Sequence, residues 1–143
     1  MAMAWMTVDQ LADADLCHAP PYSAAADDII TAANVAGNKL DGHMVGATPM
    51  EVHRMLEEER DFVFLDVRSP EECNTMPMRR STSIPLEDLR DRLNELPKGK
   101  QIVTFSTTSR RGYEAALILK AAGFREVRVM DGGVAMWPYE ELE

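Results

Sequence analysis

The sequence predicts an α/β fold with a mostly parallel central sheet, helices on both faces and a short helical appendage at the N-terminus. Two apolar runs, Phe62–Asp66 and Gln101–Phe105, have the composition of strands buried on both faces of a parallel sheet. Segments of helical periodicity alternate with such runs, as successive strand–helix–strand units require. With 143 residues, 45% of them hydrophobic, the chain is large enough for one ordinary domain with a core.

Residues 1–46 are expected to form the helical appendage. Thr7 can cap a short helix, because Gln10 stands three residues later as the partner of a capping box. A second helical pattern covers about Ser23–Leu40. Since the segment has few large apolar side chains, we expect residues 1–44 to dock on the rest of the chain or on a partner.

The boundary of the appendage is placed near residue 46 by charge and composition. Residues 1–46 hold six aspartates and one lysine, whereas the remainder holds 18 acidic and 14 basic residues. The stretch Asp41–Gly46 contains two glycines and is typical of a connection. We therefore expect a helical segment at 1–46 and an α/β domain at 47–143.

Helix and strand signals alternate through the α/β domain. Thr48-Pro49-Met50-Glu51 is a helix start, with a threonine N-cap, proline at N1 and glutamate at N3. The Phe62–Asp66 strand follows, and after an irregular stretch leucines at helical spacing predict a helix across Leu86–Leu96. Beyond the central strand and its helix, we expect a last strand at Glu126–Met130 and a helical turn within Val134–Tyr139.

The polar segment Ser106–Arg111 is the candidate site. It joins the Gln101–Phe105 strand to a helix that starts at about Gly112, and such a loop can hold an anion through backbone N–H groups and the helix N-terminus. Ligands of parallel sheets bind at the carboxyl ends of strands, where Asp66-Val67-Arg68 also lies. The candidate anion-binding residues are Thr107, Thr108, Ser109, Arg110 and Arg111. The loop contains no cysteine, histidine or carboxylate, so it lacks an obvious nucleophile.

The charge balance and the cysteine count argue against several function classes. A net charge of −9 and a pI near 4.8 disfavour a surface for nucleic acid or anionic membrane. There is neither an apolar run long enough to span a membrane nor a secretory signal pattern. Cys17 and Cys73 do not make a disulfide framework, so a cytoplasmic location is expected. His43 and His53 have no companions at ligand spacing, and we expect no metal site.

Several landmarks within residues 48–140 together resemble a rhodanese domain. They are Asp66-Val67-Arg68 with Glu71, Ile84-Pro85-Leu86 before a helix, the strand–loop–helix around Ser106, and Asp131-Gly132-Gly133 followed by Trp137. The resemblance implies a rhodanese-like fold and sulfur transfer, in which a loop cysteine attacks a sulfane donor and carries a persulfide. It also implies that loop N–H groups and an arginine stabilise the charged sulfur, and that Asp66 supports the loop.

The chain departs from the family pattern in this loop. The family usually has Cys-x-x-Gly-x-Arg, whereas Ser106 stands at the cysteine's position, Ser109 at the glycine's and Arg111 at the arginine's. A serine hydroxyl is a far weaker nucleophile at neutral pH, no base in the loop can activate it, and it cannot store a persulfide. Met76-Pro77-Met78 also replaces the family's Gly-His-Ile segment. An engineered Cys→Ser change would not explain that second departure, so we favour natural loss of the site.

Other interpretations of the loop residues stay open. Ser106 can be a solvated or N-capping hydroxyl rather than the stand-in for a cysteine. The forked guanidinium groups of Arg110 and Arg111 can bind an anion, or they can form surface salt bridges in this acidic chain.

The residues around the first core strand also have two interpretations each. Asp66 can hydrogen-bond to the loop and hold it, or it can be an ordinary aspartate at the end of a strand. Arg68 can be a cation that faces the loop, or it can pair with Glu71 and Glu72. Cys73 could be a displaced sulfur carrier, but the adjacent glutamates would raise the pKa of its thiol.

The N-terminal segment carries a second resemblance. Met6-Thr7-Val8, the stretch Leu16–Asp28 and the stretch Ala33–Asn38 look like the final part of flavin-dependent pyridine nucleotide-disulfide oxidoreductases. The branch that it resembles contains coenzyme A-disulfide reductases and NADH oxidases. There this stretch closes the dimerisation domain, and in some members a rhodanese domain follows directly. FAD and NAD(P)H are implied only for a larger parent enzyme, because no Gly-x-Gly-x-x-Gly follows a strand in this chain.

Three functional hypotheses follow. The leading one is a rhodanese-like domain from, or derived from, such an oxidoreductase, not competent for sulfur transfer and regulatory or anion-binding. Its expected partners are a small sulfur-containing or other anion in the loop, and reductase domains or a partner subunit bound through residues 1–44. The alternatives are an active sulfurtransferase, persulfide or CoA-disulfide reductase module in which Ser106 stands for a catalytic cysteine, and an oligomerisation module that forms a homodimer.

Overall fold

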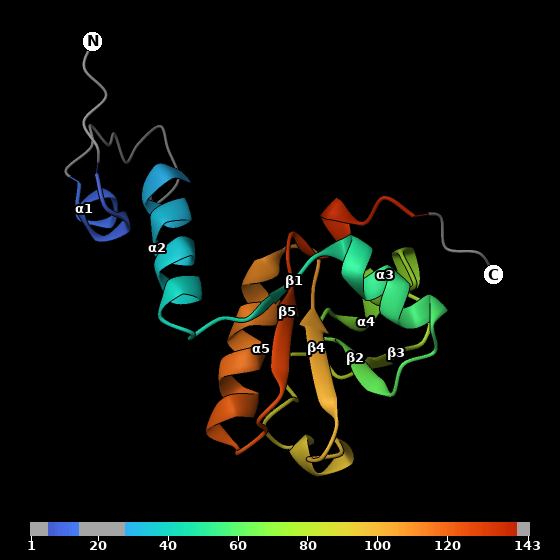
Figure 1. Ribbon diagram of the computed structural model, residues 1–143. Helices are drawn as coiled ribbons and strands as arrows, with labels where there is room; N and C mark the ends of the chain where they lie inside the picture. Colours follow the sequence, from blue (N-terminus) through green and yellow to red (C-terminus); the bar gives the residue numbers. More distant parts are fainter. Residues whose placement is uncertain (1–5, 15–27, 140–143) are drawn as a thin grey trace. The chain divides into compact units, whose positions relative to one another are not determined.

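The computed structural model describes residues 6–14 and 28–139 of the chain. The chain divides into two compact units, Met1–His43 and Met44–Glu143, and each is described by itself (Figure 1). Within the described residues, no helix combines the length and the apolar character that crossing a membrane requires.

The first unit contains two helices, α1 (Val8–Ala12) and α2 (Asp28–Leu40), which contact each other. The capping box predicted at Thr7 is confirmed, because its hydroxyl accepts the N–H of Gln10 while the Gln10 side chain accepts the N–H of Thr7. The expected helix start at Ser23 lies outside the described residues, as do Cys17 and most of the stretch that resembles a reductase.

The second unit is built on a five-stranded sheet with the order β1-β5-β4-β2-β3, and all of its pairings are parallel. Its strands are β1 (Gly46–Ala47), β2 (Phe62–Asp66), β3 (Ser81–Ser83), β4 (Gln101–Phe105) and β5 (Val127–Met130). The parallel α/β fold predicted from the sequence is therefore confirmed. Asp66 pairs with Phe105 at the ends of β2 and β4, so the segments after both strands leave the same edge of the sheet (Figure 1).

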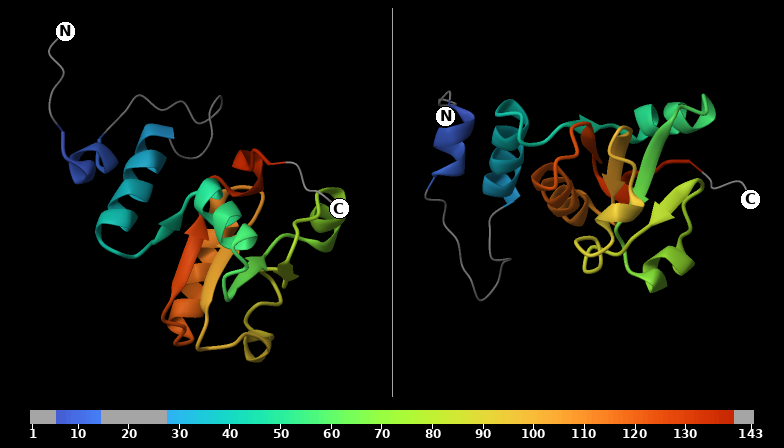
Figure 2. Two further views of the ribbon diagram at one scale, coloured as in Figure 1. Left: turned by 45° about the vertical axis from the view of Figure 1, so that its right-hand side comes forward. Right: turned by 90° about the horizontal axis from the view of Figure 1, so that it is seen from below.

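Apolar side chains cover both faces of this sheet because successive strand residues point to opposite sides. On one face, Leu65 and Ile102 belong to a buried cluster completed by residues of α5 (Ser109–Ala121). On the other face, Phe64 and Val103 join a second cluster with residues of α3 (Pro49–Glu57). Figure 2 shows these helices on opposite sides of the strands. The sheet edge that bears the candidate loop is thus held by a packed core on both sides.

The prediction of a helix across Leu86–Leu96 is wrong. The segment forms successive turns followed by a 3₁₀ helix, η1 (Leu93–Glu95), with hydrogen bonds from Leu89 N–H to Leu86 O and from Glu95 N–H to Arg92 O. The tighter three-residue repeat still brings Leu89 into full burial. Leucine spacing predicted the buried side correctly, but it did not distinguish an α-helix from a chain of turns.

The stretch expected to be irregular after β2 contains α4 (Pro70–Thr75) and the edge strand β3. Ser69 caps α4, and Glu72 returns its side chain to the Ser69 N–H, which completes a capping box. The Ser-Pro-Glu-Glu order has the same signal as the confirmed helix start at Thr48, where the hydroxyl accepts the Glu51 N–H. This helix was therefore detectable in the sequence.

The helix after β4 starts three residues earlier than expected. Thr108 is its N-cap, so Ser109, Arg110 and Arg111 belong to the first turn of α5 rather than to a loop. A helix fixes their directions about 100° apart around its axis, so their side chains do not converge on one point.

A glycine turn holds the C-terminal part of the unit against the segment that precedes α5. Gly133 opens the 3₁₀ helix η2 (Gly133–Met136), which is the helical turn expected within Val134–Tyr139 and begins one residue earlier. Gly133 has φ +62°, and a Cβ built on it would lie 2.3 Å from the carbonyl oxygen of Ser106. Only glycine allows this close approach, and η2 thereby becomes one wall of the candidate site.

Candidate functional site

The candidate site lies where β4 ends, at the sheet edge that β2 also reaches. The segment Ser106–Thr108 leads into α5, and η2 is bonded to it through two backbone hydrogen bonds. Val134 N–H donates to Ser106 O and Ala135 N–H donates to Thr107 O, each at 2.9 Å. The local conformation of this segment is therefore determined by chain that lies nearly thirty residues further on.

Ser106, the expected stand-in for a nucleophile, is completely buried. Its hydroxyl donates to Thr108 O at 2.5 Å and accepts the Gly112 N–H at 3.3 Å. Both contacts are with the backbone of the turn itself, so the hydroxyl closes the turn. Such a hydroxyl is not activated, because no base receives its proton.

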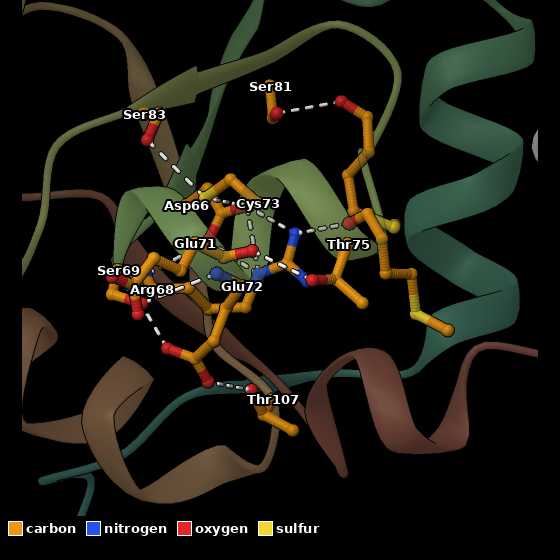
Figure 3. Close-up of polar contacts among 12 residues, drawn as sticks. Asp66, Arg68, Ser69, Glu71, Glu72, Cys73, Thr75, Ser81, Ser83 and Thr107 are labelled. Atoms are coloured by element: carbon orange, nitrogen blue, oxygen red, sulfur yellow. Dashed lines mark hydrogen bonds and ion pairs between the residues drawn. The ribbon is translucent and has the colours of Figure 1, made fainter.

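Arg111 does not point freely into the site, because it is paired with Glu72 of α4. Its Nη1 donates to Oε2 at 2.8 Å and its Nη2 to Oε1 at 2.5 Å, the two-pronged geometry of a strong guanidinium–carboxylate pair. Thr107 Oγ1 donates to the same Oε1 at 2.6 Å (Figure 3). Arg111, and after it the Thr107 hydroxyl, lowers the pKa of Glu72 well below its ordinary value. The carboxylate is therefore ionised at neutral pH.

The other three expected anion ligands are arranged differently. The Thr108 side chain makes no capping hydrogen bond. Ser109 accepts the Gly132 N–H at 2.7 Å, which ties the start of α5 to the glycine turn. Arg110 is 86% exposed and pairs with Glu114 one helical turn later, so the salt-bridge interpretation holds for it. Of the two arginines, only Arg111 reaches across to α4.

Asp66 and Arg68, the expected loop supports, form a buried ion pair with each other. The Arg68 Nη2 lies 2.6 Å from Asp66 Oδ2, and both side chains are 2% exposed (Figure 3). Arg68 also donates to Met76 O at 2.9 Å, and its guanidinium lies 5.7 Å from the Phe105 ring centroid. Of the two interpretations left open for Arg68, pairing with the adjacent glutamates is wrong, because the guanidinium bonds to Asp66 instead. The buried pair therefore links the end of β2 to the end of α4 and packs against Phe105 at the end of β4.

Cys73 lies beside this ion pair and is half-buried. Its sulfur is 3.4 Å from Asp66 Oδ2 and 3.6 Å from Ser83 Oγ. Burial raises the pKa of the Cys73 thiol, and the Asp66 carboxylate adds to that effect against the opposing Ser83 hydrogen bond. The side chain is therefore a protonated thiol at neutral pH, which is the wrong form for a sulfur nucleophile.

A pocket of about 510 Å³ opens beside the turn, between α4 and η2. Its polar wall includes Glu71, Glu72 and Thr107, and its apolar wall includes Val134 and the Trp137 ring. In the sequence, Trp137 is only a landmark of the family resemblance, and no spacing signal places Glu72 in the site. Among residues 6–14 and 28–139, no cluster of His, Cys, Asp and Glu side chains could hold a metal ion.

The Trp137 ring carries an unusual polar group. Its indole Nε1 is buried and has no hydrogen-bond partner among the described residues. The ring packs near His53 and Tyr139, with centroids at 5.9 and 5.2 Å. The Trp137 ring therefore forms an aromatic part of the pocket wall, and its position is supported by the packed rings of His53 and Tyr139.

Comparisons with known proteins show which proteins this chain resembles. The chain is 46% identical to an NAD-dependent persulfide reductase from A. fulgidus (TM-score 0.79) and 36% identical to reduced CoADR-RHD from Bacillus anthracis (TM-score 0.84). The first match covers 92% of this chain and the second 91%, but this chain spans only 23% of each of those proteins. It is also 26% identical to a sulfurtransferase of Allochromatium vinosum, over 57% of this chain and 77% of that protein.

The family comparison covers most of the second unit, from the N-cap of α3 onward. The family model described as the rhodanese-like domain matches residues 48–139, which contain β2 to β5, the turn at Ser106 and the glycine turn before η2. The chain therefore belongs to the rhodanese-like domain family.

Proposed function

We propose that this protein is a rhodanese-like module that binds a small sulfur-containing anion at the 106–111 segment without transferring sulfur. We further propose that it belongs to, or derives from, a flavin-dependent pyridine nucleotide-disulfide oxidoreductase, in which its role is regulatory. FAD and NAD(P)H would then be bound by other parts of the parent enzyme and not by this chain.

The state of Ser106 carries the first part of the proposal. Sulfur transfer through a persulfide needs a sulfur atom at the centre of the turn, and we propose that Ser106 occupies the place of the family's cysteine. Its hydroxyl is buried and bonded to Thr108 O and Gly112 N–H, so it neither carries sulfur nor loses its proton to a base. Cys73 carries the only thiol among the described residues, and burial keeps that thiol protonated by raising its pKa.

The likeness to two larger reductases supports the second part. Both matches cover more than nine-tenths of this chain, whereas the family model matches only residues 48–139. The similarity therefore includes part of the first unit, as a shared framework would require.

A thiosulfate:cyanide sulfurtransferase assay on the unmodified chain tests the lack of transfer. We expect no thiocyanate above the uncatalysed rate, and turnover that scales with protein concentration would refute the proposal. Binding is measured separately by titrating thiosulfate in a calorimeter, where heats equal to dilution alone would remove the anion site.

The alternative, that the site is active once a cysteine is present, is tested by Ser106→Cys. A persulfide that peptide mass spectrometry locates at position 106 after incubation with thiosulfate would show that the turn still supports the chemistry. Ser109→Cys serves as the control, because it places a thiol in the same turn where the hydroxyl accepts the Gly132 N–H. If neither variant gains sulfur, the loss extends beyond the single atom at position 106.

An oligomerisation role has its own supporting observation. In the first unit, Met6, Val35 and Leu40 expose 49%, 41% and 76% of their surface, which leaves apolar side chains without cover within that unit. Sedimentation of the intact chain and of a chain that starts at Val45 compares the two states. A dimer that becomes a monomer on truncation would support this role, whereas monomers in both cases would exclude it.

A further inference from the structure

We propose that Glu72 is an internal competitor for the anion site: its carboxylate occupies the guanidinium fork of Arg111, and an external anion binds there only by displacing it. This inference rests on the proposed function, in which the 106–111 segment binds an anion.

Glu72 is held as a bound oxyanion would be. Oε1 accepts from Arg111 Nη2 and Thr107 Oγ1, while Oε2 accepts from Arg111 Nη1 and the Ser69 N–H. Four donors thus converge on one carboxylate, and three of them come from the segment that the sequence predicts to hold an anion. A small oxyanion such as thiosulfate would need the same donors.

No other arginine near the segment substitutes for Arg111 in the described part of the chain. Arg68 is buried and bonded to Asp66, and Arg110 is exposed and bonded to Glu114. The site therefore offers one convergent cation, and the charge of that cation is already balanced. The affinity of the site for an anion then depends on the free energy needed to separate the Glu72 carboxylate from Arg111.

The Glu72–Arg111 pair is positioned to be displaced. Its side chains are 35% and 36% exposed, so water screens the attraction and the net stabilisation is far smaller than in a dry pair. The pocket of about 510 Å³ includes Glu72 and Thr107, but not Arg111, in its wall, so an incoming anion reaches the pair from the side of the Glu72 carboxylate. Arg68 also lines this pocket, but its guanidinium is bonded to Asp66, and both of those side chains are only 2% exposed.

Glu72→Gln separates the competitor role from the structural role of the residue. Glutamine completes a capping box as well as glutamate does, so the Ser69 N–H keeps its partner and α4 keeps its start. The substitution removes the charge that holds Arg111 and replaces one of the two acceptor oxygens by an NH2 donor, so the guanidinium fork loses its two-pronged partner. Glu71→Gln is the matched control, because Glu71 lines the same pocket and makes the same change in net charge, while the Arg111 fork stays paired with Glu72.

Calorimetric titration of the full chain with sodium thiosulfate tests the inference at constant ionic strength, with sodium chloride as the reference salt. We expect Glu72→Gln to bind thiosulfate about fivefold tighter than the unmodified chain, the ratio that an exposed ion pair can contribute. Glu71→Gln should change the affinity by less than about twofold, as expected for a screened charge. Circular dichroism spectra that match the unmodified chain establish that both variants are folded.

The outcomes separate this inference from the proposed function. If the unmodified chain binds thiosulfate and Glu72→Gln binds no tighter, or if Glu71→Gln has the same effect, Glu72 is not a competitor although the site binds anions. If only Glu72→Gln binds, the competitor role stands and the proposed binding by the native chain fails. If no form binds, both fail.

A second measurement reports on Arg111 without any anion. The arginine reagent phenylglyoxal, followed by peptide mass spectrometry, should modify Arg111 several times faster in Glu72→Gln than in the unmodified chain. The rate at Arg110 should not change, since it is paired elsewhere and serves as the internal reference. An unchanged rate at Arg111 would overturn the inference.

Discussion

Gly133 is the position at which one methyl group should do the most damage to the candidate site. Its φ of +62° lies in the left-handed region, and a Cβ there would meet Ser106 O at 2.3 Å and Thr107 O at 2.8 Å. For Gly133→Ala the left-handed backbone costs about 1–2 kcal/mol. Relieving the overlap with two backbone carbonyls costs roughly 2–3 kcal/mol more, as for other overpacked sites. We expect a total loss of about 3–5 kcal/mol in the free energy of unfolding.

Gly123→Ala is the matched control for this prediction. Gly123 also has a positive φ, +89°, but a Cβ built on it meets nothing within 4 Å. Only the backbone cost of about 1–2 kcal/mol remains. Both variants therefore carry the backbone cost, and only Gly133→Ala also carries the overlap with the turn at Ser106.

Urea unfolding at constant m-value measures both changes. We expect Gly133→Ala to be less stable than Gly123→Ala by at least ~2 kcal/mol, or a Tm lower by about 8 °C or more for a unit of this size. Equal stability of the two variants would refute the argument that η2 is pressed against the 106–108 carbonyls.

Three further predictions concern charge and hydrogen bonding. Arg68→Met should cost about 3–5 kcal/mol in urea unfolding because it leaves Asp66 buried and unpaired, whereas Arg110→Met should cost less than about 0.5 kcal/mol; similar losses would contradict the buried pair. The pKa of Glu72 is lowered in the folded protein, so the stability that its charge contributes is present above the unfolded pKa of 4.5 and is lost as the pH falls below it. The difference in stability between the unmodified chain and Glu72→Gln, about 0.5–1 kcal/mol at pH 7, should therefore shrink between pH 5 and 3 in urea titrations, and a constant difference would contradict the pairing. Ser106→Ala should cost about 1–2 kcal/mol, since the Gly112 N–H loses its partner, and a neutral effect would show that the hydroxyl does not close the turn.

The elements that the sequence predicted best are those whose signal is local. The strands at Phe62–Asp66 and Gln101–Phe105 have the predicted bounds. Each is a continuous apolar run between polar turns, and a run of that length is too short for a helix and typical of a strand. The Thr7 and Thr48 caps are correct because capping needs only residues three positions apart. The same rule applied to Ser69 would have found α4.

The errors arise where local patterns have two solutions. Leucines three or four residues apart are compatible with an α-helix and with successive turns, and at Leu86–Leu96 the core selected the turns. The start of α5 was misplaced because Thr108, and not Arg111, is the residue with extended backbone before the helix. Only the packed backbone distinguishes these cases.

The sequence by itself determined the parallel α/β fold, the family resemblance and the segment that carries the candidate site. It also showed that no cysteine, histidine or carboxylate lies within that segment, because such a fact depends on identity alone. Tertiary structure decided how the site is charged. Glu72 meets Arg111 across 39 residues, and Arg68 pairs with Asp66 rather than with its neighbouring glutamates. Such pairings depend on which side chains the packed sheet edge brings within 3 Å, and no spacing along the chain encodes that distance.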